Sequence, residues 1–398
     1  MRFKTIKLDP FSYGPFVRDG LSIKEVAIEA FRRGIVCTRP TVLINLSETG
    51  GYTDFIRTVS PLVLNERFNR TVSFTLTKLV KYDDGSYNIS NLIFKYCDVA
   101  ISVSRDKISS TCLKALKCLL SEHKIPLILD TDDDLFAIPK THPGYASYKK
   151  RLPRYIELIS MADIISASTK YVLDGLRTHI RQDQKAIVIP NFIDTRIWNL
   201  SSACFAQTGH NNTIRALYFG TETHDADLSL VSHCIGKAAS ILQESYGITL
   251  TLTVIGGTRL PLENMTVIEV PEDKRAYPLF AAWIQSIHQD TPFDFGIAPL
   301  DLSNPINRSK SNLKFLEYSA LGIPGIYTDI EPYKDTIVDM QNGILIKAND
   351  STDWCNAVVN YSTDENLRLN IARCARDELI DHLLLQDNFE IWQAILEA

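Results

Sequence analysis

The sequence lacks several features that would assign the protein to other classes. No run of about 18 apolar residues is present, so no membrane-spanning helix is expected. Its 8 cysteines are scattered and form no Cys-x-x-Cys pair, which disfavours zinc and redox motifs and favours reduced thiols. The absence of Gly-x-Gly-x-x-Gly disfavours a nicotinamide-dependent dehydrogenase. Because the first residues also lack the long apolar segment of a signal peptide, we expect a cytoplasmic protein.

The chain does contain enough apolar residues for two domains, and its charge is uneven. It has 398 residues, of which 45% are hydrophobic. Residues 1–200 hold 29 Lys and Arg against 21 Asp and Glu, a balance of +8, whereas the remainder holds 13 against 26, a balance of −13. A basic first half favours contact with an anionic acceptor or peripheral contact with the inner face of a membrane, although ordinary drift of charge along a chain explains it equally well.

A stretch at 141–155 mixes aromatic residues with a basic cluster made of Lys149, Lys150, Arg151 and Arg154. The net charge of −5 and the lack of a nucleic-acid-binding motif disfavour a nucleic-acid partner for it. An anionic acceptor or membrane surface fits better, and a solvated helix face is the plainest alternative.

Apolar, strand-like runs alternate with helical patterns, which predicts a parallel α/β architecture. The predicted strands are 41–46, 72–76, 99–103, 127–130, 164–167 and 186–189 in the first half, and 214–219, 250–255, 266–270, 295–299, 325–328 and 344–347 in the second. Each half therefore has enough strands for its own doubly wound sheet. The polar stretch 199–213 is interpreted as the linker between a first domain, residues 1–199, and a second domain, residues 213–378.

The most informative segment is 307–324, with the sequence NRSKSNLKFLEYSALGIP. It predicts a helix with Ser309, Ser311 and Asn312 as candidate N-caps, and with Gly322 and Pro324 as its stop signal. Helical spacing also predicts one buried stripe, formed by Leu313, Leu316, Ala320 and Leu321.

Three charged residues of this segment, Lys310, Lys314 and Glu317, share a second face because they lie four and three residues apart. A helix N-terminus beside two lysines binds phosphate well. A carboxylate one turn deeper cannot bind phosphate, but it accepts hydrogen bonds from sugar hydroxyls. The pattern thus predicts a nucleoside-diphosphate site, with pyrophosphate at Lys310, a candidate catalytic residue, and ribose at Glu317. The other predicted donor-binding residues of this segment form the helix start, namely Ser311, Asn312, Leu313 and Lys314. A plain amphipathic helix with solvated lysines is the alternative.

The run 314–324, KFLEYSALGIP, resembles the second half of the C-terminal signature of retaining GT-B glycosyltransferases. That signature normally has two glutamates separated by seven residues. Glu317 matches the second, and Ser309 stands at the position of the first, which in the family lies near the donor sugar. The run 189–194, IPNFID, resembles the family's "P-N-G-I/V-D" segment at the end of the first domain.

This resemblance implies two Rossmann-like domains that face a cleft, with the final segment, 379–398, read as a helix that crosses back to the first domain. It also implies transfer of a sugar, with retention, from a nucleoside-diphosphate sugar to a glycan or lipid-linked acceptor in surface polysaccharide synthesis of the O-antigen kind. Neither a metal nor another cofactor is expected.

Two strand-to-loop turns of the second half are further candidates for donor binding. Gly220 ends a strand and lets a ligand approach the backbone, while Thr221, Thr223 and His224 offer groups for phosphate or sugar, with His224 also a candidate catalytic residue. The alternative is an ordinary capped helix. Arg259 follows the glycine pair 256–257 and is predicted to serve the base or a phosphate, and a simple turn fits as well.

Two loops of the first half are predicted to face the acceptor. Gly50, Gly51 and Tyr52 follow a strand and open a helix, an arrangement that presents backbone amides to a cleft. In the run 130–134, DTDDD, Asp132 and Asp133 are candidate catalytic residues that contact acceptor hydroxyls, while another aspartate caps a helix. Metal binding by this run and a purely structural loop are the alternatives.

Two other functions remain compatible with the sequence. A nucleotide-sugar epimerase would need acid and base groups around the sugar and no acceptor loop. The presence of Ser309 in place of the first glutamate of the signature supports the alternative of a non-catalytic GT-B partner subunit.

Overall fold

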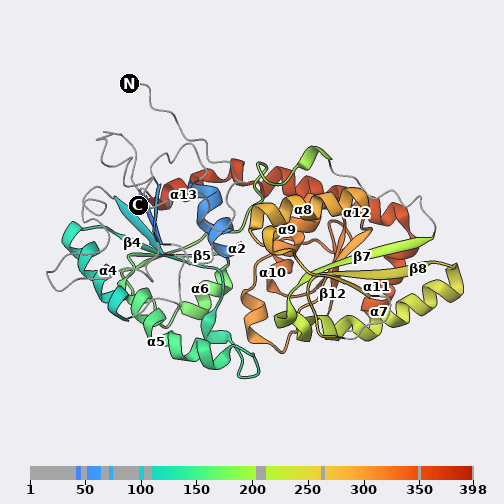
Figure 1. Cartoon of the computed structure of the whole chain (residues 1–398), viewed down its shortest axis with the longest axis horizontal. Coiled ribbons are helices and arrows are strands. Elements are labelled where there is room, and N and C mark those ends of the chain that lie inside the picture. Colours follow the sequence, from blue (N-terminus) through green and yellow to red (C-terminus); the bar gives the residue numbers. More distant parts are fainter. Residues whose placement is uncertain are drawn as a thin grey trace.

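The computed structural model describes residues 42–45, 52–63, 71–74, 98–102, 110–202, 212–260, 265–347 and 351–396. Gly50, Gly51 and most of the predicted linker 199–213 lie outside these residues. Two α/β lobes lie side by side (Figure 1), each built around one six-stranded parallel sheet. We call them the first lobe, around β1 to β6, and the second lobe, around β7 to β12.

The sheet of the first lobe has the strand order β2-β1-β3-β4-β5-β6, and all its paired strands are parallel. Its strands are β1 (Val42–Asn45), β2 (Thr71–Phe74), β3 (Val99–Ser102), β4 (Leu127–Thr131), β5 (Ile164–Ala167) and β6 (Lys185–Val188). Strands β3, β4 and β5 are buried along their whole length, as expected for parallel strands covered by helices on both faces.

The sheet of the second lobe has the order β12-β11-β10-β7-β8-β9, again with parallel pairing throughout. Its strands are β7 (Thr213–Gly220), β8 (Thr249–Gly256), β9 (Met265–Ile268), β10 (Phe295–Ala298), β11 (Gly325–Thr328) and β12 (Ile344–Ile346). Every predicted strand of both halves therefore has an observed counterpart, shifted by at most two residues at either end. Both sheets reverse their direction of strand addition once, as doubly wound sheets do.

Helices cover the faces of both sheets. In the first lobe these are α2 (Tyr52–Asp54), which continues as a π-helix η2 (Phe55–Val63), and α4 (Ser110–His123), α5 (Tyr145–Met161) and α6 (Lys170–Leu176). In the second lobe they are α7 (Asp225–Tyr246), α8 (Tyr277–Asp290), α9 (Leu313–Leu321), α10 (Glu331–Lys334), α11 (Ser351–Thr363) and α12 (Glu365–His382). Among the described helices, none combines the length and apolarity that crossing a bilayer requires.

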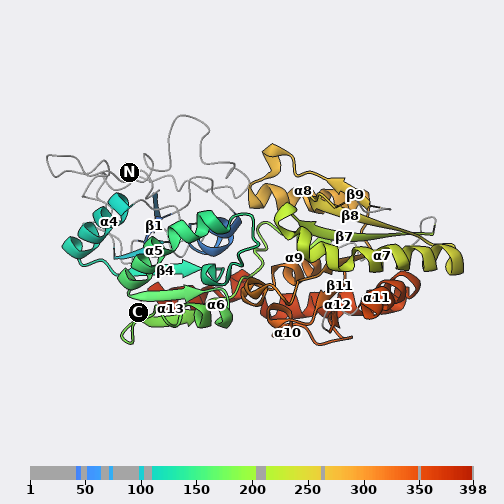
Figure 2. The same ribbon diagram turned by 90° about the horizontal axis from the view of Figure 1, so that it is seen from below.

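The C-terminal segment returns to the first lobe, as predicted, but not as one helix. Helix α12 ends at His382, a short 3-10 helix η10 (Leu385–Asp387) follows, and α13 (Phe389–Leu396) then lies with the first lobe in both views (Figures 1 and 2). The single helix predicted over 379–398 is therefore wrong. The backbone leaves the helix to pair with Ile193, whose N–H donates to Leu383 O at 3.0 Å and whose carbonyl accepts from Leu385 N at 2.8 Å.

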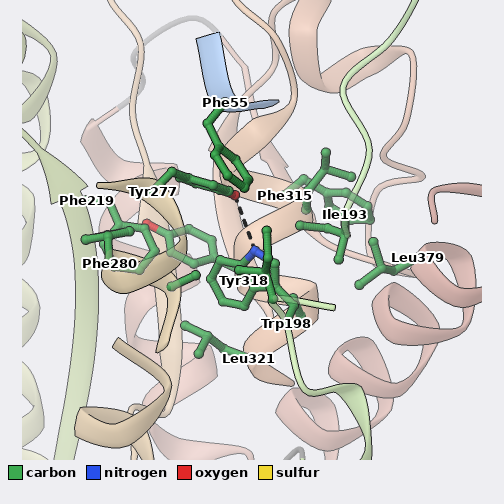
Figure 3. Close-up of a cluster of buried hydrophobic side chains, with 14 of the residues drawn as sticks. Phe55, Ile193, Trp198, Phe219, Tyr277, Phe280, Phe315, Tyr318, Leu321 and Leu379 are labelled. Atoms are coloured by element: carbon green, nitrogen blue, oxygen red, sulfur yellow. Dashed lines mark hydrogen bonds between the residues drawn. The ribbon is translucent and has the colours of Figure 1, made fainter. Parts of the chain in front are cut away.

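A continuous buried cluster joins the lobes (Figure 3). From the first lobe and the segment that leaves it come Phe55, Ile193 and Trp198, and from the second come Phe219, Tyr277, Phe280, Phe315 and Tyr318. Within this cluster the indole Nε1–H of Trp198 donates to the hydroxyl of Tyr277 at 3.3 Å. Burial of this much aromatic surface stabilises one arrangement of the two lobes, with strand ends of both sheets turned toward a shared space.

Candidate functional site

A cavity of about 260 Å³ lies between the lobes. In the second sheet it sits where the strand order reverses, between β7 and β10, which is where open α/β sheets bind their ligands. Residues of both lobes line it, namely Tyr52, Thr53, Ile56, Arg57, Asp132, Asp133, Asn191, Tyr218, Phe219, His224, Ala298, Pro299, Leu300, Lys310, Ser311, Leu313, Lys314 and Tyr333.

The start of α9 points toward this cavity, as the sequence predicted, but its capping differs. Asn312 occupies the N-cap position, and its side chain donates to Thr336 Oγ1 at 2.9 Å. Ser309 ends the preceding 3-10 helix η9 (Pro305–Ser309), and Ser311 accepts a hydrogen bond from Asn191 Nδ2 at 3.0 Å. Neither serine therefore caps α9. The predicted stop is confirmed, because Gly322 takes the left-handed conformation with φ 80°.

Helix α9 is buried on every face, because both lobes and α12 cover it. Residues 315–321 are all buried, including the charged Glu317. The predicted buried stripe is confirmed for Leu316, Ala320 and Leu321, whereas Leu313, assigned to the same stripe, is only half-buried and lines the cavity. The charged face is turned inward, which gives its residues a stronger electrostatic role than a surface position would.

Lys310 reaches across the cavity to the first lobe. Its Nζ lies 3.1 Å from Asp133 Oδ1, and the two side chains are 28% and 29% exposed. Burial opposes the charge of Lys310, but the carboxylates of Asp133, Asp132 and Asp227 outweigh it and raise its pKa. Lys310 therefore stays charged, and it is held by a partner that an incoming anion can replace.

Lys314 is the second cation of the cavity. Its Nζ lies 5.4 Å from the centre of the Phe219 ring and 3.9 Å from Glu317 Oε2. Burial lowers its pKa, Glu317 opposes this effect, and the neighbouring charge of Lys310 adds to it. An anion bound here would favour the charged form of Lys314.

Glu317 lies behind Lys314. It is 2% exposed, and burial raises its pKa against the opposing effects of Lys314 and of a hydrogen bond from the Tyr277 hydroxyl. Among the described residues, six of those predicted for donor binding stay outside the cavity lining, namely Glu317, Asn312, Gly220, Thr221, Thr223 and Arg259. Contact between ribose and Glu317 therefore stays a prediction, as does a role for the other five.

The side chains of the three adjacent aspartates of the first lobe, Asp132 to Asp134, contact different partners. Asp132 accepts from Thr53 Oγ1 at 2.6 Å, Asp133 faces Lys310, and Asp134 caps the 3-10 helix η5 (Leu135–Ala137) through Phe136 N at 2.9 Å. The prediction that one of these aspartates caps a helix is confirmed by Asp134. Within the described part of the chain no group of three or more His, Cys, Asp or Glu side chains is arranged to hold a metal ion.

Arg57 in η2 lines the cavity, and its only signal in the sequence is that it is a lone arginine in an apolar run. It is 1% exposed and forms a bidentate ion pair with the buried Asp130, in which Nε donates to Oδ2 at 2.9 Å and Nη2 donates to Oδ1 at 2.7 Å. Its Nη1 also donates to Asn191 Oδ1 at 3.1 Å, and Asn191 in turn bonds Ser311. Trp392 of α13 lies under the guanidinium at 5.7 Å. The returning C-terminal helix thus contributes to the site.

His224 lines the cavity between β7 and α7, and a second buried carboxylate orients it. Its Nδ1 lies 3.1 Å from Asp227 Oδ2, while Asp227 Oδ1 accepts from Asp301 N at 2.8 Å and from Asn307 Nδ2 at 2.7 Å. Asp227, which the sequence argument missed, therefore ties together the loops after β7 and β10. The ring nitrogen of His224 that remains, Nε2, is the atom available to a ligand.

The other residues predicted in the loops after β7 and β8 have different surroundings: Gly220 is required by close packing at its backbone, and Thr221, Thr223 and Arg259 interact with neighbours at the surface. A Cβ added to Gly220 would lie 2.4 Å from the Tyr218 ring, so only glycine fits there. Thr221 and Thr223 bond each other at 2.8 Å through their hydroxyls. Arg259 is 79% exposed and pairs with Glu222 at 2.5 Å.

No protein-family model and no curated protein matches this sequence. Solved structures do resemble it. The HepE protein of Anabaena in complex with UDP-glucose has a TM-score of 0.61 at 13% identity, over 90% of this chain and 100% of its own. Sucrose-phosphate synthase of Thermosynechococcus elongatus has a TM-score of 0.60 at 11% identity, over 90% and 98%. A glycosyltransferase of Rickettsia africae has a TM-score of 0.57 at 14% identity, over 90% and 99%. The fold is GT-B.

The predicted fold class is thereby confirmed. In this GT-B chain the cavity combines two ammonium groups and a helix start from the second lobe with two carboxylates, Asp132 and Asp133, from the first. Such an arrangement can bind a diphosphate on one wall and hydroxyl groups on the other.

Proposed function

We propose that the protein is a glycosyltransferase that takes a sugar from a nucleoside-diphosphate sugar. The observation that carries this proposal is the position of Lys310, Lys314 and the first turn of α9 on one wall of the cavity between the lobes. Two cations and a helix N-terminus offset the charge of a diphosphate. The UDP-glucose bound to the structurally similar HepE supports a nucleotide-sugar donor.

In this proposal the main catalytic effect is electrostatic. As the bond between the sugar and the diphosphate breaks, negative charge grows on the leaving phosphate oxygen, and Lys310 and Lys314 stabilise it. His224, held by Asp227, is placed to contact the same group or a sugar hydroxyl through Nε2.

The acceptor side and the stereochemistry rest on the resemblance of 314–324 to retaining enzymes. The acceptor hydroxyl attacks the anomeric carbon from the face that the diphosphate leaves, and the departing phosphate oxygen takes its proton. Asp132 and Asp133 bind acceptor hydroxyls on the opposite wall of the cavity. We propose a glycan or lipid-linked acceptor of surface polysaccharide synthesis, reached at the inner face of a membrane, with no metal or other cofactor.

The first test is a thermal-shift screen of nucleotide sugars, followed by an assay of donor hydrolysis and transfer. We expect one nucleotide sugar to raise the melting temperature in proportion to its concentration. The variant with both Lys310→Ala and Lys314→Ala should lose that response while keeping its own melting temperature. If no nucleotide sugar or nucleoside diphosphate shifts the melting temperature of the wild-type protein, the proposal fails.

One observation favours a second function, that of a non-catalytic partner subunit. Ser309, at the position of the family's first glutamate, is 3% exposed, and its hydroxyl donates to Ile306 O at 2.8 Å while it faces Asp134 N at 3.4 Å. The first lobe thus covers the position from which a glutamate would reach the sugar. Slow hydrolysis of a bound donor would indicate an enzyme, whereas binding without any hydrolysis or transfer would indicate a partner subunit.

A further inference from the structure

A chain of hydrogen bonds crosses from the sheet of the first lobe to the start of α9 in the second lobe. It begins at Asp130 on β4, which is 0% exposed and accepts from Ser166 Oγ at 2.7 Å and from Arg57 Nη2 at 2.7 Å. Arg57 Nη1 then donates to Asn191 Oδ1 at 3.1 Å, and Asn191 Nδ2 donates to Ser311 Oγ at 3.0 Å. Because Arg57, Asn191 and Ser311 all line the cavity, the chain ends where a ligand would bind.

Arg57 gives this chain a fixed end. Its Nε and Nη2 both donate to Asp130, its Nη1 also donates to Ile189 O, and its Cζ lies 5.7 Å from the centre of the Trp392 ring. The bidentate pair with Asp130 compensates the charge of the guanidinium group. Arg57 therefore acts on the cavity through Asn191 rather than through its own charge.

The chemistry of the groups determines the direction of each bond. A guanidinium group only donates, so the oxygen of the Asn191 side chain must face Arg57, and its amide nitrogen must face Ser311. That nitrogen also only donates, so the Ser311 oxygen accepts this bond and does not use its own hydrogen for it. Since Ser311 lines the cavity and follows Lys310 in the chain, its hydroxyl hydrogen is available to an anion bound there.

We propose that the Ser311 hydroxyl donates a hydrogen bond to the bound diphosphate, and that Asn191, oriented by Arg57, is the positioning residue that makes this hydroxyl a donor. The inference rests on the proposed function and adds an uncharged phosphate-binding group to the two lysines. It also gives the first lobe a part in donor binding, because Arg57 lies in η2 and Asn191 follows β6. A hydroxyl bonded to a charged phosphate oxygen forms a stronger hydrogen bond than two neutral groups do.

The experiment measures binding of UDP and of inorganic pyrophosphate by calorimetry. Ser311→Ala removes one hydroxyl from a half-buried position, so the fold should tolerate it. We expect both ligands to bind roughly tenfold more weakly, as for a lost hydrogen bond to a charged group. Unchanged affinity for both ligands would overturn the inference. Weakening of UDP alone would also refute it, because the hydroxyl would then contact the nucleoside.

Two substitutions of Asn191 test whether it determines the direction of the Ser311 hydroxyl. Asn191→Ala leaves the hydroxyl free to rotate, so both ligands should bind about two- to tenfold more weakly, as for the loss of one ordinary hydrogen bond. In Asn191→Asp, one carboxylate oxygen still accepts from Arg57, while the other accepts the hydrogen of the Ser311 hydroxyl. This variant should weaken both ligands at least as much as Ser311→Ala, because it also adds a negative charge. Wild-type affinity in either variant would refute the positioning role.

A double-mutant cycle separates positioning from a direct contact between Asn191 and the ligand, since Asn191 itself lines the cavity. If Asn191 acts through Ser311, Asn191→Ala has no further effect on pyrophosphate affinity in the Ser311→Ala background. The same factor in both backgrounds would show that Asn191 acts independently of the hydroxyl, and it would overturn the inference.

Thr336→Val is the matched control for the start of α9. The Thr336 hydroxyl accepts from Nδ2 of Asn312, the residue after Ser311, at 2.9 Å, and Thr336 lies outside the cavity lining. This variant should lose some thermal stability and retain its affinity for both ligands. A loss of affinity equal to that of Ser311→Ala would overturn the inference, because any disturbance of the α9 start would then have the same effect. A wild-type protein that binds neither ligand would instead refute the proposed function itself.

Discussion

The ion pair between Lys310 and Asp133 makes a prediction in which two substitutions have opposite effects. In the structure, the ammonium group of Lys310 lies 3.1 Å from the Asp133 carboxylate, across the cavity. A bound diphosphate must replace that carboxylate as the partner of Lys310. Lys310→Ala should therefore weaken donor binding, whereas Asp133→Asn should strengthen it.

The sizes of the two effects follow from exposure and charge. Loss of a charge-assisted hydrogen bond to phosphate costs roughly 1.5–3 kcal/mol, so Lys310→Ala should weaken nucleoside-diphosphate binding about ten- to hundredfold. The existing pair is more than a quarter exposed on both sides, so it resembles a surface ion pair. Such pairs contribute about 0.2–1 kcal/mol, and their removal by Asp133→Asn should tighten binding by about fivefold at most.

The assay is calorimetric titration of UDP, or of the nucleotide that the screen identifies, at neutral pH. Burial opposes the charge of Lys310, but Asp133 and its neighbours raise the pKa overall, so Lys310 is charged there and remains so on the alkaline side. Lys310→Met, which keeps the aliphatic stem, separates loss of charge from loss of packing. Weaker binding in Asp133→Asn, or unchanged binding in Lys310→Ala with intact folding, would show that the diphosphate does not meet Lys310.

Three further predictions concern other parts of the molecule. Transfer activity should persist in chelator, because two lysines and the α9 start supply the positive charge; activity abolished by chelator and restored by Mn²⁺ would instead support a metal at the aspartate run. Arg57→Met should lower the free energy of unfolding by about 3–5 kcal/mol in a denaturation experiment, because it leaves the buried Asp130 without its cation. A free energy of unfolding equal to that of the wild-type protein within error would contradict this. Binding to anionic vesicles should fall steeply with salt and should weaken when four basic residues of α5 are neutralised, namely Lys149, Lys150, Arg151 and Arg154. Binding that is absent at low salt would mean that these residues form only a solvated face.

Local sequence patterns were sufficient for much of the fold. Apolar runs of four to eight residues gave strands at the expected places, because buried parallel strands need nothing more than local β-propensity and apolar side chains. Gly322 stopped α9 as predicted, because its left-handed backbone conformation is a local property of glycine. The break in the C-terminal helix could not be predicted, since residues 383–385 leave the helix only to bond Ile193, a residue about 190 positions earlier.

The candidate site shows the same division. The sequence by itself determined that Lys314 and Glu317 would share one face near a helix start, because helical spacing fixes that geometry. Lys310 lies before the first turn of α9, so its position depends on the preceding loop and not on helical spacing. Only the tertiary structure decided what each of them meets: Asp133 from the first lobe for Lys310, the Phe219 ring for Lys314, and the Tyr277 hydroxyl for Glu317. These partners come from strands, loops and helices far apart in the chain, and packing of the two lobes, rather than any local pattern, brings them together.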